Sequence, residues 1–198
     1  DEWIVRDQGA IVRQIGYSPE EFAQITIAKE GGYNKAKKIL NKSDLKPSNY
    51  HPIPVKTNSA GEKYSKILDK IFTNEYDFKD YDRATNIYWP GNKLGHGRED
   101  VVKLWNSLKN ILSETKFKIE HVGYLDEPNR NPRASIRWSI EGVHSEDSND
   151  YGKKTNSSLN IIGINHAELN SYGVIKEWVL FDEVAIWKQI LMNKNKDG

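Results

Sequence analysis

Cysteine is absent from the 198 residues of this chain. Disulfide bonds, thiolate catalysis and cysteine-ligated zinc are therefore excluded. An excess of one charge is also missing, because 29 Lys and Arg residues and 28 Asp and Glu residues give a formal net charge of +1. This balance gives no electrostatic case for nucleic acid or an anionic membrane as the main partner.

Long apolar runs are missing as well. No run approaches the eighteen or so residues of a membrane span, and no signal peptide opens the chain. We therefore expect a cytoplasmic protein, although the chain begins at Asp1 rather than Met, as a processed or truncated chain would. Apolar residues make up only 37%, yet aromatic residues reach 11% and include six Trp. Aromatic side chains bury much area each and often line ligand pockets.

The two ends of the chain resemble each other. Residues 2–15 read EWIVRDQGAIVRQI and residues 177–190 read EWVLFDEVAIWKQI, with seven identities in fourteen positions. Each copy reads as a short strand ending at an Asp, Asp7 or Asp182, which caps an amphipathic helix. We interpret this as a duplication. Residues 1–16 would then be the C-terminal strand and helix of a truncated first domain, residues 17–60 a helical linker, and residues 61–198 a complete domain.

Helices precede strands along most of the chain. Residues 46–61 read as a Pro-containing linker, and residues 145–158 read as a long polar loop and possible lid. Helix signals cover residues 18–30, 33–42, 59–72, 98–113 and 182–192, and strand signals cover residues 84–90, 117–125, 134–144, 159–169 and 174–181. This order predicts an α+β fold in which a curved antiparallel sheet wraps N-terminal helices and leaves a conical pocket.

Several stretches, in their order and spacing, resemble the SnoaL-like polyketide cyclases of the nuclear transport factor 2-like superfamily. They are Asn86-Ile-Tyr-Trp-Pro-Gly, Gly97-Arg-Glu with its helix, Ile136-Arg-Trp leading to Gly142-Val-His144, Ile162-Gly-Ile-Asn-His166 and Gly173-Val-Ile-Lys-Glu-Trp178. The likeness covers about residues 60–191. It implies a cone-shaped α+β barrel that dimerises through its sheet and performs acid–base chemistry without a metal or organic cofactor.

The resemblance places a pocket histidine at His166. It places the acid–base aspartate of the family at Val179 or Leu180, which cannot accept a proton. An imidazole can deprotonate a carbon acid near neutral pH, and Glu168, two residues along the strand, could orient the ring. We therefore predict His166 and Glu168 as the catalytic residues. The alternative is a histidine that is satisfied by a neighbouring backbone group.

Aromatic and imidazole side chains are predicted to line the pocket. This substrate-binding set comprises Tyr88, Trp89, Trp105, Trp138, His144 and Trp178. Ordinary core packing is the alternative for the aromatic residues, and a loop anchor is the favoured alternative for His144. Two histidines without an HExxH motif or a third ligand do not indicate a metal site. Glu177 and Asp182 recur as Glu2 and Asp7, which favours scaffold roles, with Asp182 as a helix cap.

Together these features predict a domain that binds a small, largely apolar or carbonyl-containing ligand in a conical pocket. Cyclase-, isomerase- or hydrolase-type acid–base chemistry without a cofactor would then act on that ligand. The alternative is a non-catalytic binding or assembly module that has lost the aspartate of the family. We expect a homodimer or pairing with the sister domain, and no nucleic-acid or membrane partner.

Overall fold

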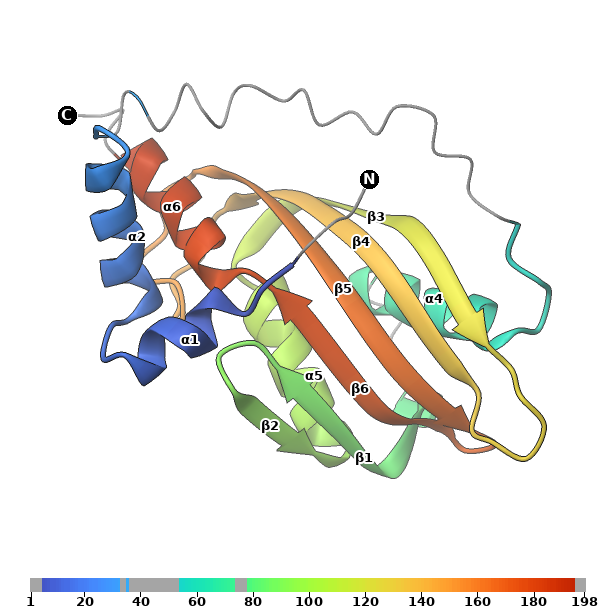
Figure 1. Ribbon diagram of the computed structural model, residues 1–198. Coiled ribbons are helices and arrows are strands. Elements are labelled where there is room, and N and C mark those ends of the chain that lie inside the picture. Colours follow the sequence, from blue (N-terminus) through green and yellow to red (C-terminus); the bar gives the residue numbers. More distant parts are fainter. Residues whose placement is uncertain (1–4, 33–34, 36–53, 74–77, 195–198) are drawn as a thin grey trace.

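The computed structural model describes residues 5–32, 35, 54–73 and 78–194 (Figure 1). The predicted helix over residues 33–42 and much of the predicted linker lie outside the described residues. A broad sheet forms the centre of the molecule, with α4 and α5 behind it and α1, α2 and α6 gathered at one end. In the part of the chain described, no helix has the length and apolar character needed to cross a membrane.

Six strands form a single sheet. Their bounds are Tyr81–Trp89 (β1), Lys93–His96 (β2), Leu112–Leu125 (β3), Arg133–His144 (β4), Ser158–Asn170 (β5) and Gly173–Phe181 (β6), and their order is β2-β1-β6-β5-β4-β3. Neighbours are antiparallel except for β1 and β6, which run parallel. The predicted α+β class is confirmed, and the sheet is largely antiparallel as expected, with one parallel pair that the sequence did not indicate. Parallel pairing needs a long crossover, and here the whole segment between β1 and β6 supplies it.

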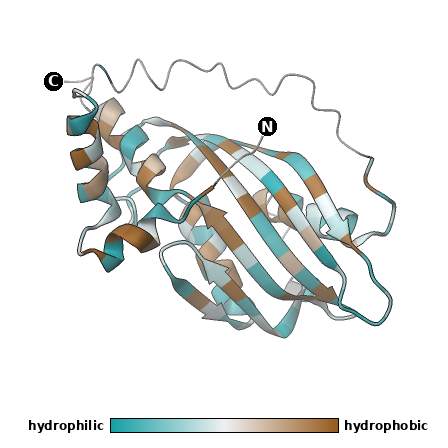
Figure 2. Ribbon diagram, viewed as in Figure 1, coloured by the Kyte–Doolittle hydropathy of each residue, from teal (hydrophilic) through white to brown (hydrophobic). Residues whose placement is uncertain are grey.

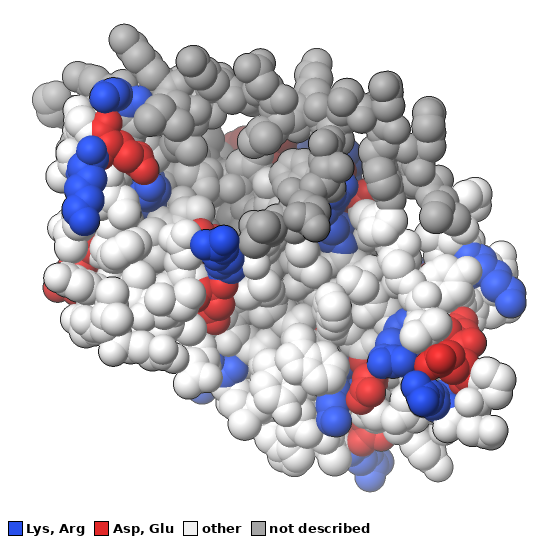
Figure 3. Space-filling view, in the orientation of Figure 1, with Lys and Arg blue, Asp and Glu red and all other residues white. Residues whose placement is uncertain are grey.

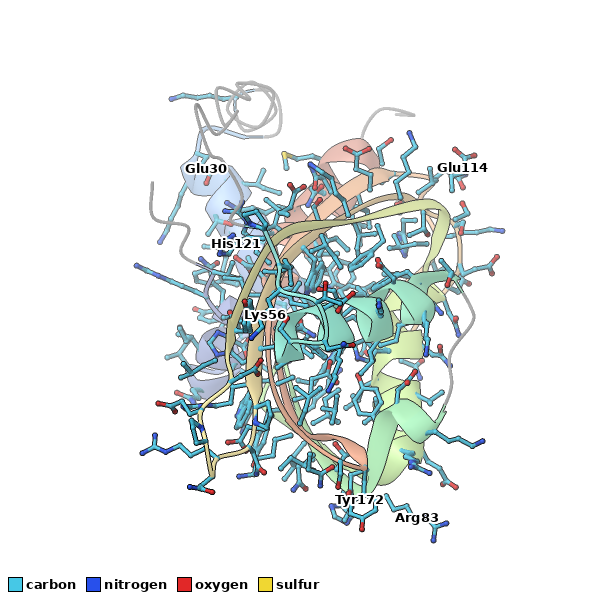
Figure 4. All side chains as sticks on the ribbon, turned by 90° about the vertical axis from the view of Figure 1, so that its right-hand side faces the viewer. Glu30, Lys56, Arg83, Glu114, His121 and Tyr172 are labelled. Carbon is cyan, nitrogen blue, oxygen red and sulfur yellow. The ribbon has the colours of Figure 1, made fainter. Side chains whose placement is uncertain are left out.

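Two amphipathic helices cover the concave face of the sheet. Tyr64, Leu68 and Ile71 repeat at helical spacing on α4 (Ala60–Thr73), which contacts β3 and β4. On α5 (Gly97–Lys109), which contacts β1 and β2, the buried residues are Val101, Trp105 and Leu108. Figure 4 shows the sheet curving around α4. Between α4 and β1 the chain makes a short 3-10 helix, η1 (Phe78–Asp80).

Alternation along the strands determines which side chains enter the core. Ala134, Ile136, Trp138 and Ile140 of β4 are buried, as the sequence pattern predicts. On β5 the buried positions are the odd-numbered ones from 159 to 169. Hydrophobic and hydrophilic residues accordingly alternate along the strands in Figure 2. Because the side-chain period is two, every second residue of β5 faces away from the helices.

The two repeated segments have the same local structure at their helix caps. The Asp7 side chain accepts from Ala10 N at 2.8 Å at the start of α1 (Gln8–Gln14), and the Asp182 side chain accepts from Ala185 N at 3.1 Å at the start of α6 (Glu183–Lys194). The two alanines occupy equivalent positions in the repeat. The predicted capping role of Asp182 is confirmed, whereas descent from a sister domain stays a prediction.

The N-terminal segment packs on the rest of the chain. The carboxylate of Asp7 also accepts from Gly91 N at 2.9 Å, and Arg13 forms an ion pair with the buried Glu183 at 2.5 Å. The second helix, α2 (Pro19–Lys29), contacts α6 and begins with the predicted capping box, in which Glu21 N donates to Ser18 Oγ at 3.1 Å.

The sequence prediction misplaced two boundaries. The predicted loop over residues 91–97 contains β2, which is only four residues long and keeps Leu94 66% exposed. Gly95 is buried there, where a Cβ atom would lie 2.8 Å from both Asp100 and Ile87. The predicted helix over residues 98–113 ends at Lys109, because Leu112 already pairs with His144 of β4 as part of β3.

Candidate functional site

The structure divides the predicted site residues between the two faces of the sheet. Trp89, Trp105 and Trp138 lie in the interior, each no more than 4% exposed. Tyr88, Trp178, His166 and Glu168 lie on the outer face. The predicted set therefore does not form one pocket.

His166 occupies the outer face, so the expectation that it lies inside the cone is wrong. Leu159, Ile161 and Asn165 on β5 are buried, whereas Ile162 and His166 are exposed. His166 pairs with Trp178 of β6, and Trp178 pairs with Tyr88 of β1. The rings of Tyr88 and Trp178 are stacked with centroids 5.4 Å apart, at exposures of 40% and 39%.

Charged residues border this aromatic row. The Glu168 carboxylate lies 3.7 Å from Lys176 Nζ, so its ion-pair partner is a lysine of β6. A shallow cavity of about 390 Å³ involves His166, Glu168 and Trp178. In Figure 3 the middle of this face is largely uncharged, and side chains of both signs gather toward one end. The catalytic roles of His166 and Glu168 stay predictions, on a face different from the one expected.

His144 anchors the long loop after β4. Its ring is fully buried, Nδ1 lies 3.1 Å from Thr155 Oγ1, and its backbone bonds to Ser157 and Asn156. The Nε2 atom has no hydrogen-bond partner among the described residues. Burial lowers the pKa of this imidazole, against an opposing effect of Asp147. The geometry matches the loop-anchor alternative.

The interior holds a buried acid, Glu177. Its side chain is 0% exposed. Tyr64 Oη donates to Oε1 at 2.5 Å, and Asn165 Nδ2 donates to the same oxygen at 3.0 Å. Tyr81 Oη donates to Oε2 at 3.0 Å and Trp105 Nε1 at 3.4 Å. Four donors from α4, β1, α5 and β5 thus converge on one carboxylate of β6.

Asn165 connects this carboxylate to the aromatic core. Its Nδ2 atom also donates to the Tyr64 hydroxyl oxygen at 2.7 Å, and its Oδ1 atom accepts from Trp138 Nε1 at 2.7 Å. Trp138 packs against Trp105 and Phe181, with ring centroids 6.2 and 6.3 Å away. Polar groups buried this deeply are stable only when they are hydrogen-bonded. The Glu177 cluster, comprising Glu177, Asn165, Tyr64, Tyr81 and Trp105, meets that condition.

Burial changes the proton affinity of Glu177. Desolvation raises the pKa of this carboxyl group from 4.5 to about 7, and the hydrogen bonds from Tyr64, Tyr81, Trp105 and Asn165 oppose the rise. Burial and the charge of Glu177 in turn raise the pKa of the Tyr64 hydroxyl well above its ordinary value. A carboxyl group with a pKa near 7 has the proton affinity that acid–base chemistry near neutral pH requires.

A cavity of about 1030 Å³ lies near this cluster and is here named the basic cavity. It lies between α4, η1, the start of β1, the first turn of α5 and the turn between β5 and β6. Figure 4 labels Tyr172 and Arg83, two of its lining residues, at the lower edge of the molecule. The apolar part of the lining includes Ile67, Leu169 and Tyr172. Tyr172 is 74% exposed, so its ring is accessible to a ligand.

The cavity and the Glu177 cluster share structural elements but not an opening. Tyr64 lies one helical turn before Ile67 of the cavity wall, and Tyr81 lies between the lining residues Asp80 and Asp82. Both tyrosines are 0% exposed. A ligand in the cavity therefore reaches the carboxylate only if one of these two side chains moves.

Sequence reasoning missed most of the Glu177 cluster. It named Trp105 but took Glu177 as scaffold because of the repeat, and it did not single out Tyr64, Tyr81 or Asn165. The sequence did contain a signal for Glu177. In a strand, residues 177, 179 and 181 lie on the same face, and Val179 and Phe181 are apolar and buried. An acidic residue on the apolar face of a strand is expensive to bury, which makes it a candidate for a special role.

No group of three or more His, Asp and Glu side chains that could hold a metal ion occurs among the described residues. The sequence matches no known family model and no curated protein. Similarity appears at the level of solved structures.

Three of these structures illustrate the likeness. A SnoaL-like polyketide cyclase from Agrobacterium tumefaciens has a TM-score of 0.52 and 13% identity, over 68% of this chain and 99% of that one. A proposed polyketide cyclase from a Silicibacter species has a TM-score of 0.54 and 10% identity, over 66% and 96%. The proposed hydroxylase AclR from Streptomyces galilaeus has a TM-score of 0.50 and 15% identity, over 70% and 98%. The chain thus has the α+β fold of the SnoaL-like polyketide cyclases, which is the nuclear transport factor 2-like fold.

Proposed function

We propose that this protein is a small-molecule-binding domain that holds its ligand in the basic cavity rather than in the interior of the curved sheet. The volume of the cavity, about 1030 Å³, carries this proposal. Small-molecule sites typically measure about 300 to 1,000 Å³ and combine apolar walls with a few polar groups. Ile67, Leu169 and Tyr172 supply such walls.

Packing of the interior supports the same assignment. Trp105, Trp138, Tyr64, Tyr81 and Phe181 are all fully buried and occupy the space between the sheet and the helices. The donors around Glu177 already satisfy both of its oxygens. A ligand inside the cone would have to displace these side chains, whereas a ligand in the basic cavity displaces only water.

Binding of a neutral fluorescent probe, N-phenyl-1-naphthylamine, tests the proposal. We expect saturable binding with one site per chain, and a loss of about five- to tenfold in affinity for Tyr172→Ala, because removal of the ring exposes apolar ligand surface. Tyr17→Ala is the matched control, since Tyr17 is an exposed tyrosine outside the cavity. Absence of probe binding, or equal affinities for the two variants, contradicts the proposal.

Proton transfer by Glu177 is a second candidate function, favoured by its pKa of about 7 inside an aromatic environment. The ionised carboxylate would take a proton from the carbon next to a carbonyl group, and the enolate would then be reprotonated. This step requires that Tyr64 or Tyr81 move aside. In this second candidate function the acid–base group of the domain is Glu177 rather than His166.

Hydrogen–deuterium exchange at the α-carbon of a simple ketone, 4-phenyl-2-butanone, measures this chemistry. If Glu177 acts as a base, the wild-type protein accelerates exchange in D2O, and Glu177→Gln removes the acceleration because an amide does not accept the proton. Glu168→Gln, on the outer face, is the control that should keep it. An exchange rate equal to that of buffer alone rejects the second candidate and leaves the binding function standing.

A further inference from the structure

We infer that the ligand of the basic cavity is an amphipathic anion, an apolar body that carries one carboxylate, sulfonate or phosphate group. This inference rests on the proposed binding function and specifies its ligand class. Six basic and two acidic side chains line the cavity, whereas the chain as a whole is almost neutral. Such a local excess of one charge in a concave site concentrates ligands of opposite sign.

Several of these charges already have partners. Lys70 Nζ lies 2.9 Å from Asp80 and Lys66 Nζ lies 2.9 Å from Glu62, so each of these lysines already has an acidic partner. Arg98 Nε donates to the backbone oxygen of Tyr81 at 2.6 Å, which fixes the guanidinium at the cavity wall.

Asp82, the other lining acid, is also engaged. Its carboxylate accepts from Ala84 N at 2.8 Å and from Asn170 Nδ2 at 3.4 Å. These hydrogen bonds lower its pKa, and the charge of Arg98 adds to the effect. Asp82 therefore stays ionised at the cavity wall, and together with Asp80 it offsets only two of the six positive charges that line the cavity.

Lys79 also has a partner, which leaves two of the six basic residues for a ligand. Lys63 and Arg83 have neither an ion pair nor a side-chain hydrogen bond within the described part of the chain. Lys63 precedes Ile67 by one turn of α4, and Arg83 lies in β1, toward the same edge as Tyr172 in Figure 4. A ligand can therefore pack its apolar body on Ile67, Leu169 and Tyr172. Its charged group then has two unpaired cationic side chains within the same cavity, Lys63 on α4 and Arg83 on β1.

The geometry favours a small amphipathic anion over a nucleic acid. Nucleic-acid sites extend along a positively charged face, and the near-zero net charge of this chain gives little long-range attraction. An apolar wall beside two unpaired cations fits a molecule with one charged end. Because Lys63 and Arg83 are exposed, an ion pair with either side chain adds only modestly to the binding free energy. Burial of the apolar body of the ligand supplies the rest.

Two probes with the same aromatic skeleton distinguish the contribution of charge to the affinity from that of apolar contact. They are 8-anilinonaphthalene-1-sulfonate and its neutral counterpart, N-phenyl-1-naphthylamine. For the double variant Lys63→Gln/Arg83→Gln we expect the affinity for the sulfonate to fall about five- to tenfold and that for the neutral probe to change less than about twofold. Raising the salt from about 0.05 M to about 0.5 M should weaken only the sulfonate, because salt screens exposed charges.

The control is Lys118→Gln/Arg130→Gln, which removes two basic residues of 71% and 69% side-chain exposure outside the cavity. It should leave both affinities unchanged. If the neutral probe binds but the sulfonate responds equally to both double variants, the anion inference fails while the binding function stands. If neither probe binds, both fail. Binding only to anionic phospholipid vesicles, with loss in the cavity variant, also overturns the inference and assigns the lysines and arginines to a membrane surface.

Discussion

Replacement of Glu177 by glutamine is expected to abolish a loss of stability that the wild-type protein suffers as the pH rises from about 4.5 to about 7. The carboxyl group is completely buried, and its pKa in the folded protein is about 7, against 4.5 as the ordinary value. The folded state therefore binds this proton more tightly than the unfolded state does.

The direction of the effect follows from proton linkage. Below about pH 4.5 the group is protonated in both states, and its stabilising contribution is fully present. Between the two pKa values the unfolded state ionises first, so stability falls as the pH rises through about 7 and then levels off. The difference between the two pKa values corresponds to about 3 kcal/mol. Glutamine stays neutral throughout, so this contribution does not vary in Glu177→Gln.

Glutamine is also a reasonable fit to the site. Its amide oxygen can accept from Tyr64 and Asn165, as Oε1 of Glu177 does, and its amide nitrogen can donate to the hydroxyl oxygen of Tyr81, which can turn to accept. Only the long hydrogen bond from Trp105 Nε1, at 3.4 Å, loses its acceptor. The variant should therefore fold, and near pH 8 it should be as stable as the wild-type protein or more so.

Urea unfolding of both proteins between about pH 4 and about pH 9 measures the effect as the difference between their free energies of unfolding. Other titrating groups, such as Asp182 and His144, largely cancel in that difference. Glu168→Gln on the outer face is the control and should follow the wild-type curve. Parallel curves for the wild type and Glu177→Gln would mean that Glu177 has an ordinary pKa in the folded protein.

Much of the fold could be predicted from the sequence because its signals are local. The capping box at Ser18 and Glu21, the alternation over residues 134–140 and the Asp182 cap all depend on residues near one another in the chain, and the structure contains each of them. The parallel pairing of β1 with β6 depends on contacts between distant segments. No local pattern encodes such a pairing, which is why it was missed.

The site was harder to predict, because it depends on which face of β5 turns inward. The resemblance placed His166 toward the pocket, and Ile162 and Ile164 share the even-numbered face of β5 with it. The structure buries the opposite face, where Gly163 and Asn165 lie between Ile161 and Ala167. Asn165 enters the core because Trp138, Tyr64 and Glu177 satisfy its amide, and these partners come from three other elements. Hydropathy alone cannot reveal such compensation.

Replacement of Gly163 by alanine is expected to destabilise the protein by about 3 kcal/mol or more. Gly163 lies on the buried face of β5, beside Asn165. A Cβ atom at this position would lie 2.0 Å from Cζ2 of Trp138 and 2.4 Å from two further ring atoms. No real contact is that short, so the indole ring or the strand must shift. The glycine thus makes room for the largest side chain of the neighbouring strand.

The Trp138 ring has little freedom to move away. It is fully buried, packs among Trp105, Phe117 and Phe181, and donates its Nε1 hydrogen to Asn165 at 2.7 Å. A shift of the ring would break this hydrogen bond and disturb the amide that binds Glu177. Overpacking alone costs about 1–3 kcal/mol of stability. Each buried polar group that loses its hydrogen bond adds about 1–3 kcal/mol to this loss.

Gly123→Ala on β3 is the matched control for this prediction. The Cβ atom added there would lie 3.8 Å from the backbone oxygen of Ser135, which is ordinary contact. Because glycine weakens a strand, this variant should be unchanged or more stable by up to about 1 kcal/mol. Urea unfolding measures both variants, and near-ultraviolet circular dichroism reports whether the tryptophan environment changes only in Gly163→Ala. Equal stabilities of the two variants would contradict the prediction and show that the β5 backbone or the Trp138 ring shifts at little cost.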